Sequence, residues 1–248
     1  MSGFLEATVS RRVEWAPGLV TLELSANLDP FEPGQFVNLA LGVDDGGLVR
    51  RPYSLASAPG APPEILLTCV DGGALSPRLC ALAVGDRVLV ERRAQGFFTA
   101  SWLPPAKDLW LIATGTGLGP YLSLLRSGVL WERFERVVVV HGVRWRSHLA
   151  HRAELCALAD ARAPQLAYAP LVSREASDAE VLGGRITAAV ASGALEERVG
   201  LRLASDRSHV MLCGNPAMIE ELGIVLAERG LNRHRARKPG HVTVEKYW

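Results

Sequence analysis

The segment Arg51-Pro52-Tyr53-Ser54 places a cation, a flat aromatic ring and a hydroxyl within four residues. A flavin dinucleotide has a group for each of them: a pyrophosphate for Arg51, a flat ring system for Tyr53, and a ring nitrogen within reach of Ser54. Pro52 cannot donate a ladder hydrogen bond, so we expect the segment at a sheet edge or strand end. An ordinary strand that carries Arg51 and Tyr53 on its surface remains the alternative, since short motifs often match by chance.

Two glycine-containing turns in the second half of the chain could hold phosphate groups. In the first, Gly115-Thr116-Gly117-Leu118-Gly119-Pro120 follows an apolar run and opens an expected helix, a context in which backbone N–H groups and the helix dipole meet a pyrophosphate. Pro120 stands where the fingerprint G-x-G-x-x-G has its third glycine, although proline suits a first helical turn. In the second, Cys213-Gly214-Asn215-Pro216 repeats the pattern. Either turn could also be a plain strand-to-helix connection.

The elements that must position these residues change in kind along the chain. Up to about residue 100, short runs alternate apolar and polar residues between turns, which predicts a small antiparallel barrel or sandwich. A short helix is expected over 75–83, and its start at Ser76 is a candidate anion site or a plain helix cap. The expected strands lie at 7–10, 20–24, 35–39, 65–69 and 87–91.

Pro104 and Pro105 interrupt the pattern, so we place a domain boundary there, between domains 1–103 and 104–248. Beyond it, apolar strands alternate with helices, which predicts a parallel sheet covered on both faces, an α/β nucleotide-binding fold. Strands are expected at 109–113, 137–141, 166–171, 210–213 and 241–245, and helices at 119–127, 150–161, 185–192 and 216–228.

The composition of the 248 residues limits the class of protein. The net charge of +1 and the hydrophobic content of 48% are typical of a soluble globular protein and argue against general nucleic-acid binding. The apolar runs are too short to span a membrane and the first residues do not resemble a signal peptide, so we expect a cytoplasmic protein. The four cysteines contain no C-x-x-C pair, so neither an iron–sulfur cluster nor a zinc site is expected.

The ordered motifs R-x-Y-S, G-x-L-S, G-T-G-x-x-P, V-S-R-E, C-G-N-P and a terminal carboxylate-x-Tyr resemble the ferredoxin–NADP reductase family. In particular, the chain resembles the short bacterial ferredoxin (flavodoxin)–NADP reductases that end in an aromatic pair. The resemblance runs from Pro33 to Trp248. It implies an FAD-binding barrel, an NADP-binding α/β domain, and electron exchange between NADP(H) and a one-electron carrier.

The resemblance assigns FAD contacts residue by residue. Arg51 matches the arginine that pairs with the FAD pyrophosphate, Tyr53 the tyrosine on one flavin face, and Ser54 the hydroxyl beside the reacting ring nitrogen. Residues 73–76 match the loop that caps the same pyrophosphate. The full set assigned to FAD is Arg51, Pro52, Tyr53, Ser54, Thr68, Ala74, Leu75, Ser76, Thr116, Tyr247 and Trp248.

The resemblance also assigns NADP contacts. Thr116 lies in the family's glycine-rich loop, and Ser173 and Arg174, with Arg185, resemble the pocket for the 2′-phosphate. Guanidinium forks and a hydroxyl suit a dianionic phosphate, whereas NAD pockets usually present an acid to the ribose. Glu175 could pair with Arg174, and each arginine taken singly could be a solvated charge. The full set assigned to NADP is Thr116, Val143, Arg144, Ser173, Arg174 and Arg185.

Four residues are expected at the reacting groups by the same resemblance: Ser54, Cys213, Glu245 and Tyr247. Cys213 matches a cysteine near the nicotinamide, and Glu245 a carboxylate that orients it or relays a proton. Tyr247 would cover the second flavin face and Trp248 the adenine, so removing both should change nicotinamide affinity and the preference between NADP and NAD. In the alternative, Cys213 and the terminal aromatics belong to the core.

The expected partner is ferredoxin or flavodoxin, an acidic electron carrier, and we expect a monomer. A basic segment, Arg229, Arg233, Arg235, Arg237 and Lys238, suits such a carrier, or is a solvated helix end. Two other functions stay open: the NAD(P)H-dependent reductase component of an oxygenase, and a flavin-binding protein without catalysis. Oxygenase reductases often carry a C-x4-C-x2-C cluster, which is absent from this sequence.

Overall fold

The computed structural model describes residues 3–43 and 46–246. The chain divides into two compact units, one of residues 1–100 and 119–128, the other of residues 101–118 and 129–248. The segment 119–128 thus packs with the first unit although it follows residue 103 in sequence. The limits given above for the FAD-binding and NADP-binding domains stay a prediction.

The first unit is a six-stranded antiparallel sheet with strand order β4-β3-β6-β1-β2-β5. The two edge strands β4 and β5 contact each other, so the sheet curls into a barrel. Leu22, Leu39, Leu67 and Val90 fill its interior and are at most 2% exposed. The elements of this unit are β1 (Phe4–Ala16), β2 (Leu19–Ser25), β3 (Phe36–Gly42), β4 (Leu48–Ser54), β5 (Glu64–Thr68), α1 (Ser76–Cys80), β6 (Arg87–Glu91) and α2 (Gly119–Ser127).

The second unit is a six-stranded parallel sheet with strand order β10-β9-β8-β7-β11-β12. Its central strands are almost entirely buried and mainly apolar, because both faces are covered. The strands are β7 (Asp108–Thr114), β8 (Arg136–Val143), β9 (Leu166–Val172), β10 (Leu182–Gly183), β11 (Ser208–Gly214) and β12 (Val242–Lys246).

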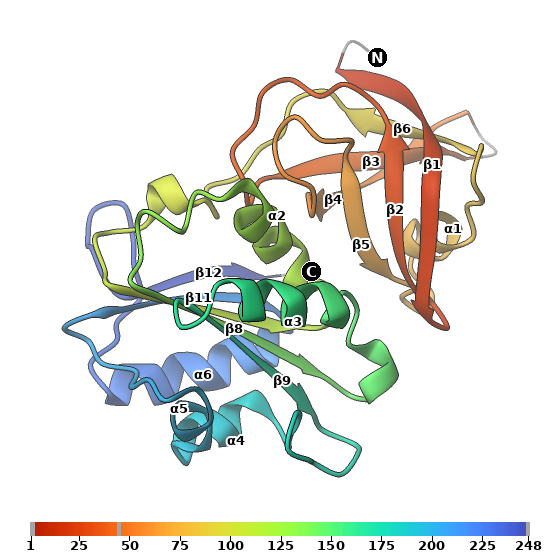
Figure 1. Ribbon diagram of the computed structural model, residues 1–248. Coiled ribbons are helices and arrows are strands. Elements are labelled where there is room, and N and C mark those ends of the chain that lie inside the picture. The colour runs from red at the N-terminus through yellow and green to blue at the C-terminus, as the bar shows by residue number, and fades with distance from the viewer. Residues whose placement is uncertain (1–2, 44–45, 247–248) are drawn as a thin grey trace. The chain divides into compact units, whose positions relative to one another are not determined.

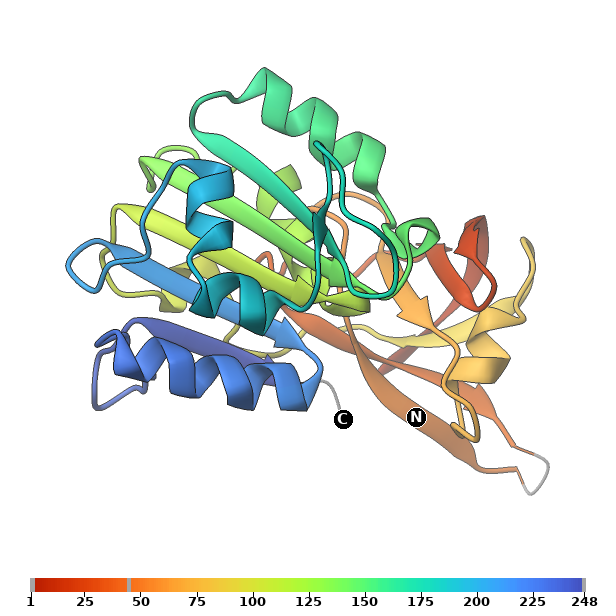
Figure 2. The same ribbon diagram turned by 90° about the horizontal axis from the view of Figure 1, so that it is seen from below.

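Helices cover both faces of this parallel sheet (Figures 1 and 2). Helix α3 packs on one face, and α4, α5 and α6 pack on the other around Trp110, Val138 and Leu212, each 0% exposed. The helices are α3 (Arg152–Ala161), α4 (Ile186–Ala191), α5 (Ala194–Val199) and α6 (Pro216–Glu228), with short 3-10 turns at Ala100–Trp102, Gly115–Leu118 and Arg146–His148.

The chain therefore has the fold class predicted from its sequence, an antiparallel barrel followed by a parallel α/β sheet. The predicted position of Pro52 is confirmed, since β4 is an edge strand of the antiparallel sheet. The helix expected over 75–83 is shorter and spans Ser76–Cys80. Among the described helices and strands, β4, the short strand β10 and helix α5 are absent from the expected elements.

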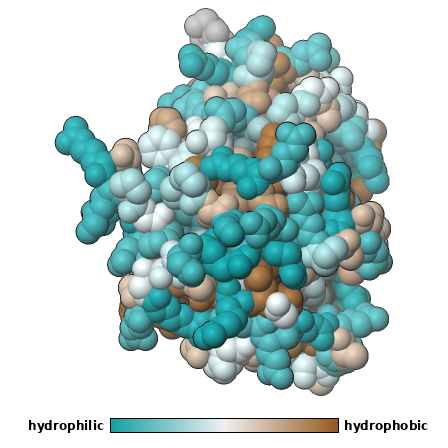
Figure 3. Space-filling model, turned by 60° about the vertical axis from the view of Figure 1, so that its left-hand side comes forward, coloured by the Kyte–Doolittle hydropathy of each residue, from teal (hydrophilic) through white to brown (hydrophobic). Residues whose placement is uncertain are grey.

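The molecular surface is mainly hydrophilic on the face in Figure 3, where apolar side chains form small separate patches. Such scattered apolar residues are normal for a surface in contact with water. Among the described residues, no helix is long and apolar enough to cross a membrane.

Candidate functional site

The edge strand β4 carries the first set of candidate residues. Arg51 and Pro52 are exposed, Tyr53 is half-buried against the barrel core, and Ser54 is buried at 6% exposure. The Arg51 guanidinium donates to the Arg50 carbonyl at 2.8 Å and forms no ion pair with a described residue. Burial, reinforced by Cys80 and opposed by Arg51, raises the pKa of Tyr53 to about 12. At neutral pH this strand therefore offers a cation available for an anion and a protonated phenol.

The chain after Ser54 is held by helix α2 of the same unit. The Ser123 hydroxyl donates to the Ser57 carbonyl at 2.6 Å. The Arg126 guanidinium donates to the Ala56 carbonyl at 2.9 Å and to the Glu64 carboxylate at 2.8 Å. Since both partners of the Arg126–Glu64 pair are largely buried, the end of β4 is fixed more firmly than a surface loop.

The other residues assigned to FAD lie around the end of β5 and the start of α1. The Thr68 hydroxyl donates to the Gly18 carbonyl at 3.2 Å, and the Ser76 oxygen accepts from the Val70 backbone N–H at 3.1 Å. Ala74 is exposed and Leu75 is buried in the barrel core. Helix α1 has only five residues, so binding of an anion here depends on backbone N–H groups and the Ser76 hydroxyl proton rather than on a helix dipole.

In the second unit, the strand order reverses beside β7: the chain runs outward from β7 to β10 and then returns to place β11 on the other side of β7. Strand β8 continues the sheet on one side of β7, and β11 continues it on the other. In open α/β sheets, ligands bind at the carboxyl ends of the strands beside such a switch point. The glycine-rich turn after β7 and the Gly214-Asn215 turn after β11 both lie there.

These two turns are in direct backbone contact. A Cβ atom added to Gly117 would lie 2.6 Å from the Cys213 carbonyl oxygen, so only glycine permits this approach. Gly214 has φ +119°, and a Cβ there would lie 2.3 Å from the Thr114 hydroxyl oxygen. That oxygen in turn accepts from the Asn215 backbone N–H at 2.8 Å. The glycines thus let the two turns pack together, a role that favours a shaped binding surface over a plain connection.

Helix α6 begins at this edge with a complete cap. The Asn215 side chain accepts from the backbone N–H groups of Ala217 and Met218, at 2.8 Å and 3.4 Å, and Pro216 occupies the first turn. Asparagine followed by proline is a favourable start for a helix. Asn215 therefore fixes the turn that follows Cys213.

His141, on β8, contacts the glycine-rich turn, and the sequence analysis did not identify it as a site residue. Its side chain is 0% exposed, and its Nε2 lies 3.1 Å from the Gly115 carbonyl oxygen. Burial lowers the pKa of His141 to about 4, with a smaller contribution from His151. The ring is therefore neutral at pH 7, and its Nε2–H donates to Gly115. A histidine at the end of a run of four valines is the sequence signal that could have identified it.

Cys213 and Glu245 lie side by side, as expected of residues acting at one place. They are cross-strand partners on β11 and β12, and Cys213 is buried while Glu245 is half-buried. Thr116, in the 3-10 turn after β7, is 8% exposed. Tyr247 and Trp248 lie outside the described residues.

The arginines assigned to NADP gather at the carboxyl ends of β8 and β9. The Arg174 backbone N–H donates to the Arg144 carbonyl at 3.0 Å, and the Ser173 backbone N–H donates to the Val143 carbonyl at 3.0 Å. Arg185 follows Gly184, whose N–H donates to the Val172 carbonyl at 2.8 Å. We call Arg144, Arg174 and Arg185 the arginine cluster; all three are exposed.

None of the three arginines of this cluster forms an ion pair with a described residue. The Arg174 guanidinium lies 5.8 Å from the centre of the Trp145 ring, a cation–π distance. The possible Arg174–Glu175 pair considered above is not formed, because Glu175 contacts Arg146 instead. The cluster thus holds an uncompensated positive charge, and the residues fit a dianionic phosphate.

Among the described residues, no group of three or more His, Cys, Asp or Glu side chains could hold a metal ion. None of the four cysteines forms a disulfide.

A parallel sheet with two close turns at its switch point and a cationic strand end defines a dinucleotide-binding protein. A family model described as "Oxidoreductase NAD-binding domain" matches residues 111–222. The chain is 40% identical to the flavodoxin/ferredoxin–NADP reductase of Escherichia coli K12, over the full length of both chains. It is 37% identical to the ferredoxin–NADP reductase of Pseudomonas aeruginosa, over 87% of this chain and 86% of that protein. The chain belongs to the flavodoxin/ferredoxin–NADP reductase family.

A solved structure gives the same result at the level of the fold. The ferredoxin NADP+ reductase of Neisseria gonorrhoeae, crystallised with bound FAD and NADP, superposes with a TM-score of 0.92 at 28% identity. The match covers 99% of each chain. Similarity over the whole length means that both units have their counterparts in that enzyme.

Proposed function

We propose that this protein is a flavoenzyme that exchanges electrons between NADP(H) and a one-electron carrier, ferredoxin or flavodoxin, through FAD. The observation that supports it most directly is the arginine cluster without compensating acids at the carboxyl edge of the parallel sheet. The full-length relatives named flavodoxin/ferredoxin–NADP reductase support the same function.

The first unit would hold FAD. The Arg51 guanidinium, which has no ion pair with a described residue, is suited to bind the pyrophosphate as a fork. Tyr53 would lie on one face of the flavin, and Ser54 would present its hydroxyl to the reacting edge. Residues 73–76 and Thr68 would line the remaining part of the pyrophosphate site, and Tyr247 and Trp248 would cover the other side. FAD, when bound, supplies the change from a two-electron transfer to single-electron transfers.

The second unit would hold NADP(H). The backbone of the turn that contains Thr116 would receive the nucleotide, shaped by the close packing of Gly117 on Cys213. The arginine cluster and Ser173 would bind the 2′-phosphate. Cys213 and Glu245, which are adjacent on β11 and β12, would flank the nicotinamide and orient it. Holding the reacting groups in the correct orientation lowers the entropic part of the reaction barrier.

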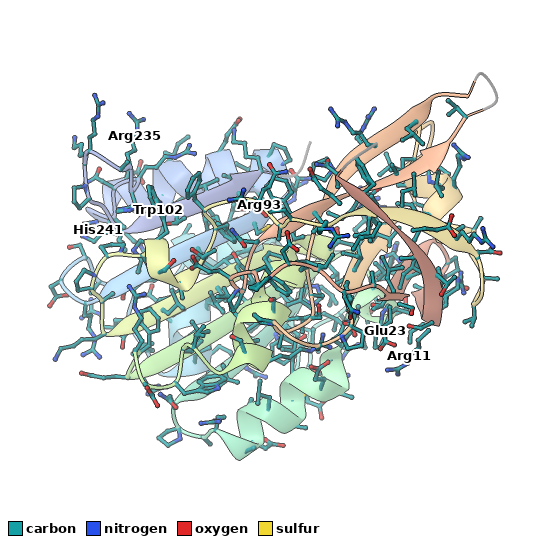
Figure 4. The ribbon with its side chains drawn as sticks, turned by 90° about the horizontal axis from the view of Figure 1, so that it is seen from above. Arg11, Glu23, Arg93, Trp102, Arg235 and His241 are labelled. Atoms are coloured by element: carbon teal, nitrogen blue, oxygen red, sulfur yellow. The ribbon has the colours of Figure 1, made fainter. Side chains whose placement is uncertain are left out.

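For the carrier, we propose an acidic protein that docks by charge. Arg233, Arg235, Arg237 and Lys238 are exposed on a tight turn between α6 and β12, closed by paired backbone hydrogen bonds between Arg235 and Lys238. Figure 4 shows Arg235 at the same end of the second unit as Trp102 and His241. Arg229 does not belong to this surface, because it pairs with Glu196 at 2.6 Å. A monomer in the cytoplasm stays the prediction for assembly and location.

The experiment that tests this function is an anaerobic titration of the purified protein, followed by its visible spectrum, with NADPH and separately with NADH. We expect flavin absorption bands that bleach at much lower NADPH than NADH. Equal bleaching by both nucleotides would favour the reductase component of an oxygenase. A flavin that neither nucleotide reduces would indicate a binding protein, and a protein unable to bind FAD would contradict the assignment of residues 51–54.

A further inference from the structure

A loop of residues 173–181 leaves the end of β9 (Figure 1) and carries three acids that follow Arg174 of the arginine cluster in sequence. Glu175 directly follows Arg174, and Asp178 and Glu180 come soon after it. A carboxylate beside the cluster would neutralise an arginine and repel a dianionic phosphate. It would also supply the acid that pockets for NAD usually present to the ribose. Where these acids point therefore affects which nucleotide is bound.

All three acids are held by arginines that are not members of the cluster. The Glu175 carboxylate accepts from the Arg146 backbone N–H at 2.9 Å and lies 3.8 Å from the Arg146 Nε. The Arg146 Nη1 lies 2.9 Å from the Asp178 carboxylate, and its Nη2 donates to the Ala176 carbonyl at 3.4 Å. Glu180 pairs with Arg152. One guanidinium, that of Arg146, thus binds the loop at three points.

Of the two acids bound by the Arg146 guanidinium, Glu175 has fewer other bonds: without that side chain it keeps only the backbone N–H of residue 146. Asp178 also accepts from the backbone N–H groups of Glu180 and Val181, both at 2.8 Å, so its carboxylate keeps its place without Arg146. Among the described residues, Glu175 pairs with no other side chain, and the residue before it is Arg174. Without the Arg146 side chain, Glu175 would keep a single hydrogen bond and would be free to turn toward Arg174, the residue before it.

We propose that Arg146 is a positioning residue for nucleotide specificity, which holds Glu175 away from Arg144, Arg174 and Arg185 so that these bind the 2′-phosphate of NADP(H). The inference rests on the proposed function. Arg146 does not bind the nucleotide itself. Arg146 keeps the positive charge of the cluster uncompensated. Trp145 contacts the Arg174 guanidinium separately, through its ring.

The test is calorimetric binding of 2′,5′-ADP and of 5′-AMP to the purified protein and its variants. The two probes share the adenosine 5′-phosphate and differ in the 2′-phosphate. For Arg146→Met, which keeps the aliphatic stem and removes the charge, we expect the affinity for 2′,5′-ADP to fall about tenfold, equivalent to about 1.4 kcal/mol. We expect binding of 5′-AMP to stay within a factor of two. In steady-state assays, KM for NADPH should rise while kcat and KM for NADH hold.

The decisive variant is Arg146→Met combined with Glu175→Gln. If Arg146 acts by holding the Glu175 charge, removing that charge restores most of the affinity for 2′,5′-ADP. Arg152→Met is the matched control, because it releases Glu180 of the same loop, six residues beyond Arg174, and should leave the ratio of the two affinities unchanged.

Three results would overturn the inference: equal loss for both probes in Arg146→Met, no recovery in the double variant, or the same change of ratio in Arg152→Met. Each would mean that Arg146 only supports the loop. If the wild-type protein itself bound 2′,5′-ADP no more tightly than 5′-AMP, the assignment of NADP in the proposed function would fail instead.

Discussion

At the scale of single residues, the second unit uses neutral histidine as a structural donor. His141 is enclosed by the sheet, and its low pKa keeps one proton on the ring, which the Gly115 carbonyl fixes on Nε2. Nδ1 is buried without a partner among the described residues. A buried ring nitrogen without a hydrogen-bond partner lowers the stability of the fold, so the bond to Gly115 must offset that loss. This bond fixes the position of Gly115, the first residue of the glycine-rich turn.

Replacing His141 therefore tests how far nucleotide binding depends on this turn. For His141→Phe we expect a loss of about 1–3 kcal/mol in the free energy of unfolding, since the Gly115 carbonyl loses its donor. KM for NADPH should rise several-fold, because the turn is less well fixed. His141→Gln, which can still donate from an amide, should recover part of both effects. Urea unfolding and steady-state kinetics measure them, and a wild-type KM in His141→Phe would contradict the role.

At the scale of elements, the close contact of two turns requires glycine at position 117, whereas Gly223 in the same unit can be replaced by alanine. For Gly117→Ala, the added Cβ would lie 2.6–2.9 Å from backbone atoms of Cys213 and Gly214, which cannot move aside like a flexible side chain. We expect a loss on the order of 1–3 kcal/mol in the free energy of unfolding and weaker binding of NADPH.

Gly223→Ala is the matched control in the same unit. Gly223 lies inside helix α6, and an added Cβ would meet nothing within 4 Å. Alanine has the higher helix propensity, so this variant should gain up to about 1 kcal/mol with unchanged kinetics. Chemical denaturation of both variants checks the pair. Equal behaviour of the two would show that the contact between the turns carries no energetic weight.

The basic turn between α6 and β12 is a second element, and its role in carrier binding can be tested separately from nucleotide binding. Glutamine at Arg233, Arg235, Arg237 and Lys238 should raise KM for an acidic carrier by on the order of tenfold at low salt and flatten its salt dependence. Reduction of ferricyanide should not change. The turn precedes β12, so within the second unit it lies at the amino ends of the parallel strands, whereas the residues assigned to the nucleotide lie at their carboxyl ends. A parallel loss of both activities would point to a different role.

The elements also show how far sequence patterns reach. The strands at 109–113 and 137–141 were predictable because burial on both faces leaves apolar runs, in the second case four valines before His141. Strand β4 is largely exposed from Leu48 to Pro52, so nothing in its pattern marks the first half as a strand. The sequence offered Arg174, the residue before it, as a partner for Glu175. Only the folded loop determines that Arg146, 29 residues earlier, is its partner.

At the scale of the whole molecule, the chain divides into two compact units that need not unfold together. Trp102, Trp110, Trp131 and Trp145 all belong to the second unit, whereas Trp15 belongs to the first. Tryptophan fluorescence therefore reports mainly on the unit that carries His141 and His209. Far-UV circular dichroism reports on both units, so the two signals together separate their transitions.

The buried histidines predict that this second unit loses stability in acid. Burial, with contributions from His234, His241 and Arg133, lowers the pKa of His209 to about 3, and its Nε2 lies 2.9 Å from the Thr243 hydroxyl. The pKa of His141 is lowered to about 4. In the unfolded chain both rings titrate near pH 6.5, so below that pH the unfolded state binds protons that the folded state does not.

The stabilising contribution is therefore complete above pH 6.5 and is lost as the pH falls toward 4. Since one pKa unit corresponds to about 1.4 kcal/mol, the loss is on the order of 3 kcal/mol for each histidine between pH 6.5 and 4. Urea unfolding followed by tryptophan fluorescence at several pH values measures it. His209→Gln, which cannot titrate, should show a shallower decline than the wild type over the same range. An identical decline in both proteins would mean that carboxylates elsewhere, rather than His209, govern the acid sensitivity of this unit.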